Sequence, residues 1–202
     1  MRLTILLFDG FTALDVVGGY EVLANVPGRL GMLAYRSFDQ LATTDILYVP
    51  GGPGVTAALD NGPLLDCIRR LDAASQWTVS VCNGAELLGA AGLLAGKHVT
   101  TNWFARDKVA AYGAFIEPAR FHRDGKLITG AGVSASIDTG LFLAALLAGE
   151  TTARLIQFGI EYYPAPPFGT RSADDEPEAA KAVIRRIEQS ALQRLAARDI
   201  PF

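Results

Sequence analysis

Residues 77–85 read WTVSVCNGA, and this stretch decides the fold class. Its first five residues favour β-structure, while residues 86–94 favour a helix that ends at Gly96. Cys82 therefore lies at a tight turn from a strand into a helix, as the nucleophile does in a nucleophile elbow. The N–H groups and partial positive charge of a helix N-terminus lower the pKa of a thiol below about 8.5 and can receive an oxyanion. A small buried hydrophobic cysteine is the alternative, and the turn alone supports the two interpretations equally.

The segments on either side of this turn alternate between strand and helix patterns. Strands are predicted at 3–8, 45–49, 77–81 and 127–129, and helices at 14–24, 63–74, 86–94, 136–148, 151–162 and 178–197. Apolar strands separated by helices indicate an α/β fold whose mostly parallel sheet is covered on both faces. In such sheets ligands bind beyond the carboxyl ends of the strands. The loops that we expect to form the site are therefore 9–15, 50–54, 82–85 and 130–136.

The size and composition of the chain limit its organisation. Its 202 residues predict one domain over 1–202, in which a Pro-rich loop, 163–177, precedes a last helix at 178–197. Half of the residues are hydrophobic and 19% are charged, which excludes a disordered chain. Two cysteines provide neither a disulfide framework nor a four-cysteine zinc site, and Cys67 occupies an apolar position of a helix.

Charge and hydropathy exclude other classes of protein. The 18 Lys and Arg against 21 Asp and Glu give a net charge of −3 without a basic cluster, which argues against nucleic-acid binding. The longest apolar run, 141–148, is far shorter than the roughly 20 residues of a membrane span. The N-terminus lacks the cleavage region of a signal peptide. We therefore expect a cytoplasmic protein that binds neither nucleic acid nor membrane.

Two further features lie on the loops of the predicted site. Asp15 is an acidic residue within an apolar stretch after the first strand. It is either a first-turn partner of the helix dipole or a carboxyl group in the crevice of the site, and the first interpretation is favoured. The PGGPG sequence at 50–54 is favoured as a plain tight turn, although its glycines would also let the Gly52 N–H complete an oxyanion pocket. His98 and His122 have no spacing that points to Cys82, so no Cys–His pair is predicted.

Several segments together resemble a known family. Residues 7–10 (LFDG), 14–15 (LD), 48–52 (YVPGG) and 80–85 (SVCNGA) follow the order seen in the ThiJ/PfpI superfamily. The isocyanide hydratase branch of that superfamily is similar at residues 90–97 (AAGLLAGK), 100–103 (TTNW) and, most specifically, 161–168 (EYYPAPPF). The resemblance covers nearly the whole chain. It implies a flavodoxin-like three-layer sandwich, a homodimer, and no metal or organic cofactor.

The resemblance also implies a reaction, in which a cofactor-independent lyase adds water to an organic isocyanide and forms an N-formamide. Cys82 would attack the terminal isocyanide carbon as a thiolate and form a thioimidate. Asp15 would hold a proton in the resting enzyme, hydrogen-bond to the Cys82 sulfur, supply the proton and then activate water. The N–H groups of Gly52 and Asn83 would line the pocket, and Val133 would be its apolar wall.

Three features depart from the pattern of the family. Asn83 stands where the branch commonly has threonine, which leaves an amide donor but no hydroxyl. Asn102, counted among the pocket residues, stands where the family often has histidine, which argues against protease and glyoxalase activities. The segment 25–44 is short, because the family usually has a strand and a hairpin there. We favour residues omitted from the sequence over a lost strand, since that loss would expose apolar surface.

Two other functions are left as alternatives. A glyoxalase or deglycase acting on 2-oxoaldehydes would use Cys82 as nucleophile but needs a general base, which Asn102 does not provide. A non-enzymatic redox sensor would oxidise Cys82 to a sulfinate that Asp15 and the helix N–H groups stabilise. An AraC-type regulator is disfavoured because the chain ends in one amphipathic helix without a helix-turn-helix. A class I glutamine amidotransferase is excluded because neither histidine begins a His-x-Glu motif.

Overall fold

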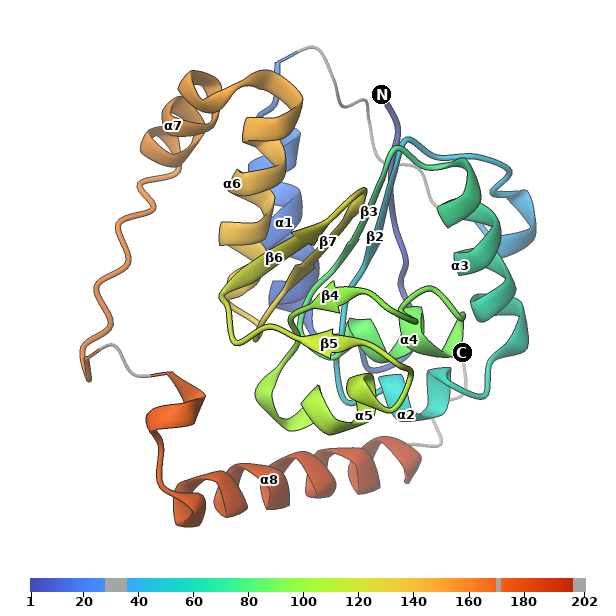
Figure 1. Cartoon of the computed structure of the whole chain (residues 1–202), viewed down its shortest axis with the longest axis vertical. Coiled ribbons are helices and arrows are strands. Elements are labelled where there is room, and N and C mark those ends of the chain that lie inside the picture. The colour runs from blue at the N-terminus through green and yellow to red at the C-terminus, as the bar shows by residue number, and fades with distance from the viewer. Residues whose placement is uncertain (28–35, 170–171, 198–202) are drawn as a thin grey trace.

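Helices cover both faces of a mostly parallel sheet, which gives the protein three layers (Figure 1). The structure is a computed structural model that describes residues 1–27, 36–169 and 172–197. The predicted fold class, a flavodoxin-like α/β sandwich, is confirmed.

The main sheet has five strands in the order β1-β2-β3-β7-β6. Its first four strands are parallel, and the last is antiparallel; the bounds are β1 (Leu3–Ile5), β2 (Ile46–Val49), β3 (Trp77–Ser80), β7 (Leu127–Gly130) and β6 (Phe121–Asp124). A separate parallel pair consists of β4 (His98–Val99) and β5 (Phe115–Ile116). The apolar pattern does not predict β4, β5 and β6, because they are short or carry polar side chains such as Arg123.

The helices form two layers, each with its own apolar core. One layer contains α1 (Ala13–Ala24), α6 (Ala135–Ala148) and α7 (Glu150–Gly159). The other contains α3 (Gly62–Ala74), α4 (Gly84–Ala90) and the short helices α2 (Val55–Ala58) and α5 (Arg106–Ala110). The remaining helices are η1 (Phe38–Gln40), η2 (Trp103–Ala105), η3 (Ala173–Asp175) and α8 (Glu178–Ala196).

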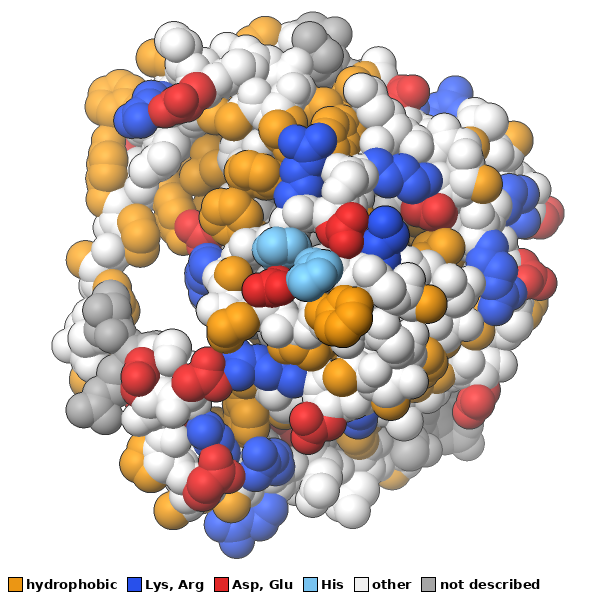
Figure 2. Space-filling model, in the orientation of Figure 1, with side chains coloured by type: hydrophobic (Ala, Val, Ile, Leu, Met, Phe, Trp, Pro, Cys, Tyr) orange, Lys and Arg blue, Asp and Glu red, His pale blue; other side chains and the backbone are white. Residues whose placement is uncertain are grey.

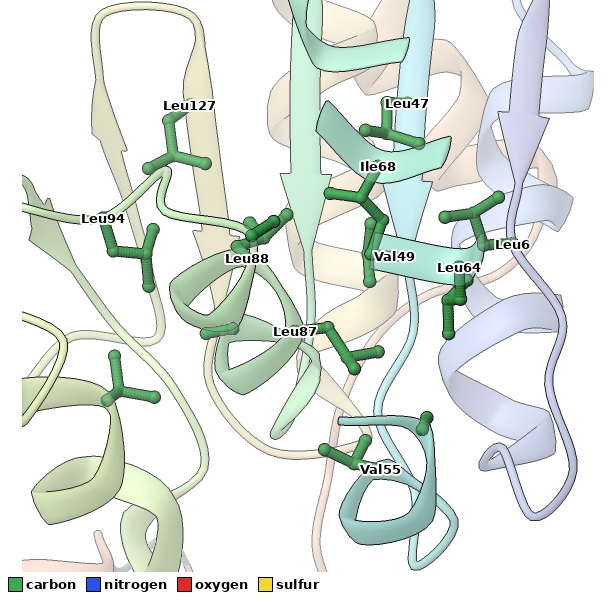
Figure 3. Close-up of a cluster of buried hydrophobic side chains, with 14 of the residues drawn as sticks. Leu6, Leu47, Val49, Val55, Leu64, Ile68, Leu87, Leu88, Leu94 and Leu127 are labelled. Carbon is green, nitrogen blue, oxygen red and sulfur yellow. The ribbon is translucent and has the colours of Figure 1, made fainter. Parts of the chain in front are cut away.

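The alternation of side chains along β2 explains why there are two cores. Ile46 and Tyr48 belong to the core under α1 and α6, whereas Leu47 and Val49 belong to the core under α3 and α4. All four side chains are fully buried, which is why the strand is a continuous apolar run in the sequence. Figure 3 shows the second core, in which side chains of α3 and α4 meet those of the sheet; its labelled members include Leu64, Ile68, Leu87 and Leu88.

The short segment between α1 and β2 leaves β1 at the edge of the main sheet. In that segment the described residues, 25–27 and 36–45, contain η1 and no strand. Residues 28–35 lie outside the described part of the chain, so the choice between a lost strand and omitted residues stays untested.

The last helix lies beneath α2 and α5, at the end of the sheet where the parallel strands finish (Figure 1). Arg106, at the start of α5, forms an ion pair with Asp174 of η3. The Arg185 guanidinium of α8 lies 5.1 Å from the centre of the Trp103 ring, as in a cation–π contact. Within the described ranges, every helix is too short or too polar to cross a membrane.

Leu88→Ala tests the placement of the core under α4. Leu88 is fully buried, so the substitution should lower the free energy of unfolding by about 2–5 kcal/mol, measured by chemical denaturation. Val183→Ala on the exposed side of α8 is the matched control and should change it by less than about 0.5 kcal/mol. Equal effects at the two positions would contradict this placement.

Candidate functional site

Cys82 lies between β3 and α4 in a backbone conformation that side chains rarely adopt. Its φ of +56° is in the left-handed region, which costs an L-residue roughly 1–2 kcal/mol. Three hydrogen bonds hold it there: the Cys82 N–H donates to the Ala131 carbonyl (2.7 Å), while the Cys82 carbonyl accepts from the Asn102 N–H (3.2 Å) and the Thr101 hydroxyl (2.7 Å). The predicted strand-to-helix turn is therefore present, and its contacts fix the place of the thiol.

The loops that follow the parallel strands come together around this turn, as predicted. The Thr12 N–H donates to the Gly51 carbonyl (2.8 Å), which joins the loops after β1 and β2. The approach of these loops requires glycine at two positions. A Cβ on Gly51 would lie 2.3 Å from the Asn83 Oδ1, and one on Gly52, whose φ is +141°, would lie 2.3 Å from the Gly10 carbonyl oxygen.

Asn83 and Gly52 bind each other across the two loops. The Gly52 N–H donates to the Asn83 Oδ1 (2.7 Å), and the Asn83 Nδ2 donates to the Gly52 carbonyl (3.1 Å). The Gly52 N–H, expected to face the pocket as an oxyanion donor, thus has a protein partner in this structure. The Asn83 N–H, by contrast, reaches the Cys82 sulfur and lowers the pKa of that thiol.

Burial decides the charge state of the Cys82 thiol. The residue is 3% exposed, and burial raises the pKa of the thiol from 9.0 to about 12. That pKa includes a smaller rise from the neighbouring charge of Asp15 and a smaller lowering by hydrogen bonds from Asn102 and Asn83. The expectation of a pKa below the free value is therefore wrong, because desolvation outweighs the helix N-terminus.

Asp15 is a fully buried carboxyl group in the first turn of α1. Its Oδ2 accepts a hydrogen bond from the Gly51 N–H (2.7 Å), and the Tyr48 hydroxyl donates to its backbone carbonyl (2.8 Å). Burial raises the pKa of the Asp15 carboxyl from 3.8 to about 7, and the Gly51 N–H opposes this rise. Its Oδ1 has no hydrogen-bond partner in the described structure, so the expected bond to the Cys82 sulfur is not formed here.

The Asn102 side chain also reaches the thiol. Val133 is close in the sequence to Ala131, whose carbonyl accepts the Cys82 N–H. The Asn102 Nδ2 donates to the Cys82 sulfur at 3.5 Å, and its Oδ1 accepts from the Phe104 N–H and so caps η2. Val133 is half-buried in the loop between β7 and α6, two residues after Ala131. Its contact with a substrate stays a prediction.

The two histidines have partners elsewhere. The His98 Nδ1 lies 2.6 Å from a carboxylate oxygen of Glu117, and the His98 ring stacks on Phe115 and faces His122 at 6.3 Å between ring centres. The described part of the chain has no cluster of three His, Cys, Asp or Glu side chains that could hold a metal ion.

Sequence analysis missed a second buried acid beside the elbow. Glu86 is 1% exposed; its Oε2 lies 3.3 Å from the Lys108 Nζ, and burial raises the pKa of its carboxyl. The side chain of Asn83 also hydrogen-bonds to it. A glutamate four residues after Cys82, within an otherwise apolar helix, was the signal available in the sequence.

Comparisons with known proteins agree with this architecture. The model of the DJ-1/PfpI family matches residues 28–146. An isonitrile hydratase from Pseudomonas putida is 38% identical over 92% of this chain and 89% of its own length. The crystal structure of a ThiJ/PfpI family protein from Pseudomonas syringae superposes with a TM-score of 0.85 and 30% identity, over 97% of this chain and 89% of that one. DJ-1beta from Drosophila melanogaster, at 18% identity and a TM-score of 0.70 over 80% of this chain and 98% of its own, shares the fold. The family expected from the sequence motifs is thus confirmed, and the chain belongs to the DJ-1/PfpI family.

Proposed function

We propose that this protein hydrates an organic isocyanide to an N-formamide through a thioimidate on Cys82. The observation that carries the proposal is the buried Asp15 carboxyl, whose pKa of about 7 lets it hold a proton near neutral pH. It lies close enough to the buried Cys82 thiol that its charge, when it is ionised, raises the pKa of that thiol. The similarity to an isonitrile hydratase supports the same reaction.

In the first step the Cys82 sulfur bonds to the terminal isocyanide carbon, and that carbon takes up a proton. Because burial disfavours a free thiolate, the thiol proton leaves as the S–C bond forms. Asp15 accepts that proton on one oxygen and delivers its own to the carbon. The product of this step is the thioimidate R–N=CH–S–Cys82, and Asp15 is again protonated.

Water then completes the reaction. Its oxygen bonds to the thioimidate carbon while the nitrogen gains a proton, again by exchange through Asp15. The C–S bond breaks next, the hydroxyl proton returns to sulfur, and the N-formamide leaves. The Asn102 amide and the Asn83 N–H, which both reach the sulfur, stabilise the charge that develops on it as this bond breaks.

The alternatives have less support from this geometry. A peroxide sensor needs an accessible thiolate, whereas Cys82 is buried with a pKa of about 12. A glyoxalase or deglycase would use a histidine near the thiol, and at the position where the family often has that histidine the side chain is Asn102, whose amide reaches the sulfur at 3.5 Å and cannot act as a base.

We also infer that one domain over 1–202 carries this function and that two copies form the functional unit. Large apolar side chains are exposed along α1, α7 and the segment after α7, which favours association with a second copy. They include Val17, Leu155, Phe158, Tyr163 and Phe168, of which Phe168 is 96% exposed.

Cys82→Ala should abolish formamide formation from cyclohexyl isocyanide, because no other group supplies the attacking sulfur. Chromatography of N-cyclohexylformamide measures the reaction. Cys67→Ala, which changes the other buried thiol, is the matched control and should retain turnover. If the Cys82→Ala variant forms the formamide faster than a reaction without enzyme, the proposal is wrong.

Asp15→Asn should lower kcat by roughly 10²–10⁴-fold, the usual contribution of an acid–base group.

The substitution Asp15→Asn should also change how the stability of the protein depends on pH. The carboxyl pKa is 3.8 unfolded and about 7 folded, so the folded state binds more protons between these values. The contribution of Asp15 to stability is therefore fully present below pH 4 and is lost as pH rises to about 7. The gain in Tm from Asp15→Asn should be near zero at pH 4 and several degrees at pH 8, measured by calorimetry. A gain that shrinks with rising pH would contradict the raised pKa.

Asn102→Ala should slow alkylation of Cys82 by iodoacetamide at pH 8 by roughly threefold or more. It removes a hydrogen bond that favours the thiolate and so raises the pKa of the thiol. Mass spectrometry measures the adduct at Cys82 separately from Cys67. Asn102→Asp keeps the oxygen that caps η2 and should slow alkylation as well. Faster alkylation in both variants would show that Asn102 does not stabilise the thiolate.

A further inference from the structure

Two consecutive residues, Thr101 and Asn102, bind both the backbone and the side chain of Cys82. The Cys82 carbonyl accepts hydrogen bonds from the Thr101 hydroxyl (2.7 Å) and the Asn102 N–H (3.2 Å). The Cys82 sulfur accepts a third from the Asn102 side-chain amide (3.5 Å). Thr101 is 1% exposed and Asn102 is 8% exposed, so water does not compete for these bonds. The distance from the amide to the sulfur is therefore coupled to the bonds that hold the carbonyl.

Thr100, the preceding residue, attaches these two residues to the main sheet. Its N–H donates to the Thr129 hydroxyl on β7 (2.8 Å), and its own hydroxyl donates to the Ala119 carbonyl (2.8 Å). Thr129 is opposite Ser80 in the pairing of β7 with β3, the strand that leads to Cys82. The residues that bind Cys82 are thus fixed to the same pair of strands that carries the turn.

The small sheet of β4 and β5 leads directly into Thr100. The carbonyl of Val99, the last residue of β4, accepts the N–H of Glu117, which follows β5 (2.8 Å). At the start of β4, the His98 N–H donates to the Asp124 carboxylate at the end of β6 (3.0 Å). Figure 2 shows histidine side chains beside acidic and basic ones near the middle of the visible face, where Figure 1 has β4 and β6. Both ends of β4 are therefore held in place.

We propose that Thr101 is a positioning residue for the reaction at Cys82, and that the sheet of β4 and β5 holds Thr101 in place. The inference rests on the proposed function and adds to it a residue that acts through Cys82. The left-handed conformation of Cys82 is unfavourable for an L-residue, so it persists only where the surrounding contacts impose it. Without the Thr101 hydroxyl this turn relaxes, and the sulfur moves away from the Asn102 amide.

The loss of this hydroxyl should affect kcat rather than KM. The Thr101 side chain is buried and its hydroxyl is bonded to the Cys82 carbonyl, so the substrate does not contact it. The amide that it positions stabilises the charge that develops on sulfur during the reaction. The fold should survive the change, because the Cys82 carbonyl keeps its bond from the Asn102 N–H.

Thr101→Val replaces the hydroxyl by a methyl group of similar size. It should lower kcat for cyclohexyl isocyanide by roughly tenfold or more, since a misplacement of about 1 Å can cost roughly 10²-fold. KM should stay within about threefold of the native value. Thr101→Ser keeps the hydroxyl and should retain kcat within about threefold.

Two further variants separate positioning from a loss of stability. Thr101→Ala differs from Thr101→Ser by the hydroxyl alone, so this pair gives the same test if the valine variant does not fold. Thr78→Val is the matched control, because Thr78 is also 1% exposed and its hydroxyl donates to the Asp72 carboxylate near the start of β3 (2.6 Å). It should retain kcat within about threefold.

Amide hydrogen exchange, followed by NMR, tests the inference without an isocyanide. The N–H groups of Cys82 and Asn102 both form hydrogen bonds that hold the turn. They should exchange roughly tenfold faster or more in Thr101→Val and Thr101→Ala, because local opening becomes easier. In Thr101→Ser and Thr78→Val their exchange should stay close to that of the native protein.

The outcomes distinguish this inference from the proposed function. Cys82-dependent turnover that neither Thr101→Val nor Thr101→Ala slows would overturn the inference and leave the function intact. Equal losses of kcat in Thr101→Val and Thr78→Val, or a rise in KM at unchanged kcat, would also overturn it. Faster exchange in the variants without the hydroxyl, with no turnover by the native protein, would overturn the function and support Thr101 as the residue that holds the turn.

Discussion

The hydrogen bond from the Cys82 N–H to the Ala131 carbonyl joins the sheet to the site. In the parallel pairing of β3 with β7, Ser80 is opposite Thr129. The bond from Cys82 to Ala131 lies two residues further along each strand and continues that pairing. The Ala131 N–H in turn donates to the carbonyl of Arg120, just before β6. The strained turn at Cys82 therefore depends on the order of strands in the sheet, and the apolar cores on both faces maintain that order. The position of the thiol therefore depends on the whole sandwich rather than on a local motif.

Burial determines which reactions the groups at this turn can carry out, because it sets their protonation. Desolvation acts on the thiol and on the Asp15 carboxyl in the same direction, towards the neutral form. Two anions in this space would repel each other, so proton movement has to accompany bond formation. An isocyanide suits such a site because it is neutral and its terminal carbon accepts both the sulfur and a proton. Burial of both groups thus favours addition over reactions that need a preformed thiolate.

Much of the fold could be predicted because buried parallel strands are continuous apolar runs, as residues 46–49 show. The two-residue strands β4 and β5 lacked such a pattern. At the site, Cys82, Asp15, Asn83 and Asn102 come together because they follow strands or adjoin them. The pKa of the thiol could not be predicted, since it depends on how completely distant segments exclude water. The position of α8 was equally hidden, because it depends on side-chain contacts such as that of Arg185 with Trp103.

The paired hydrogen bonds between Asn83 and Gly52 have a consequence for how this sequence can vary. The Asn83 side chain fills the space that a side chain at position 51 would need. It also occupies the Gly52 N–H. A shorter residue at position 83 would break the link between the two loops and leave the Gly52 N–H without its present partner. Positions 51, 52 and 83 are therefore constrained jointly, and among homologues we expect them to covary as one unit that keeps the two loops joined.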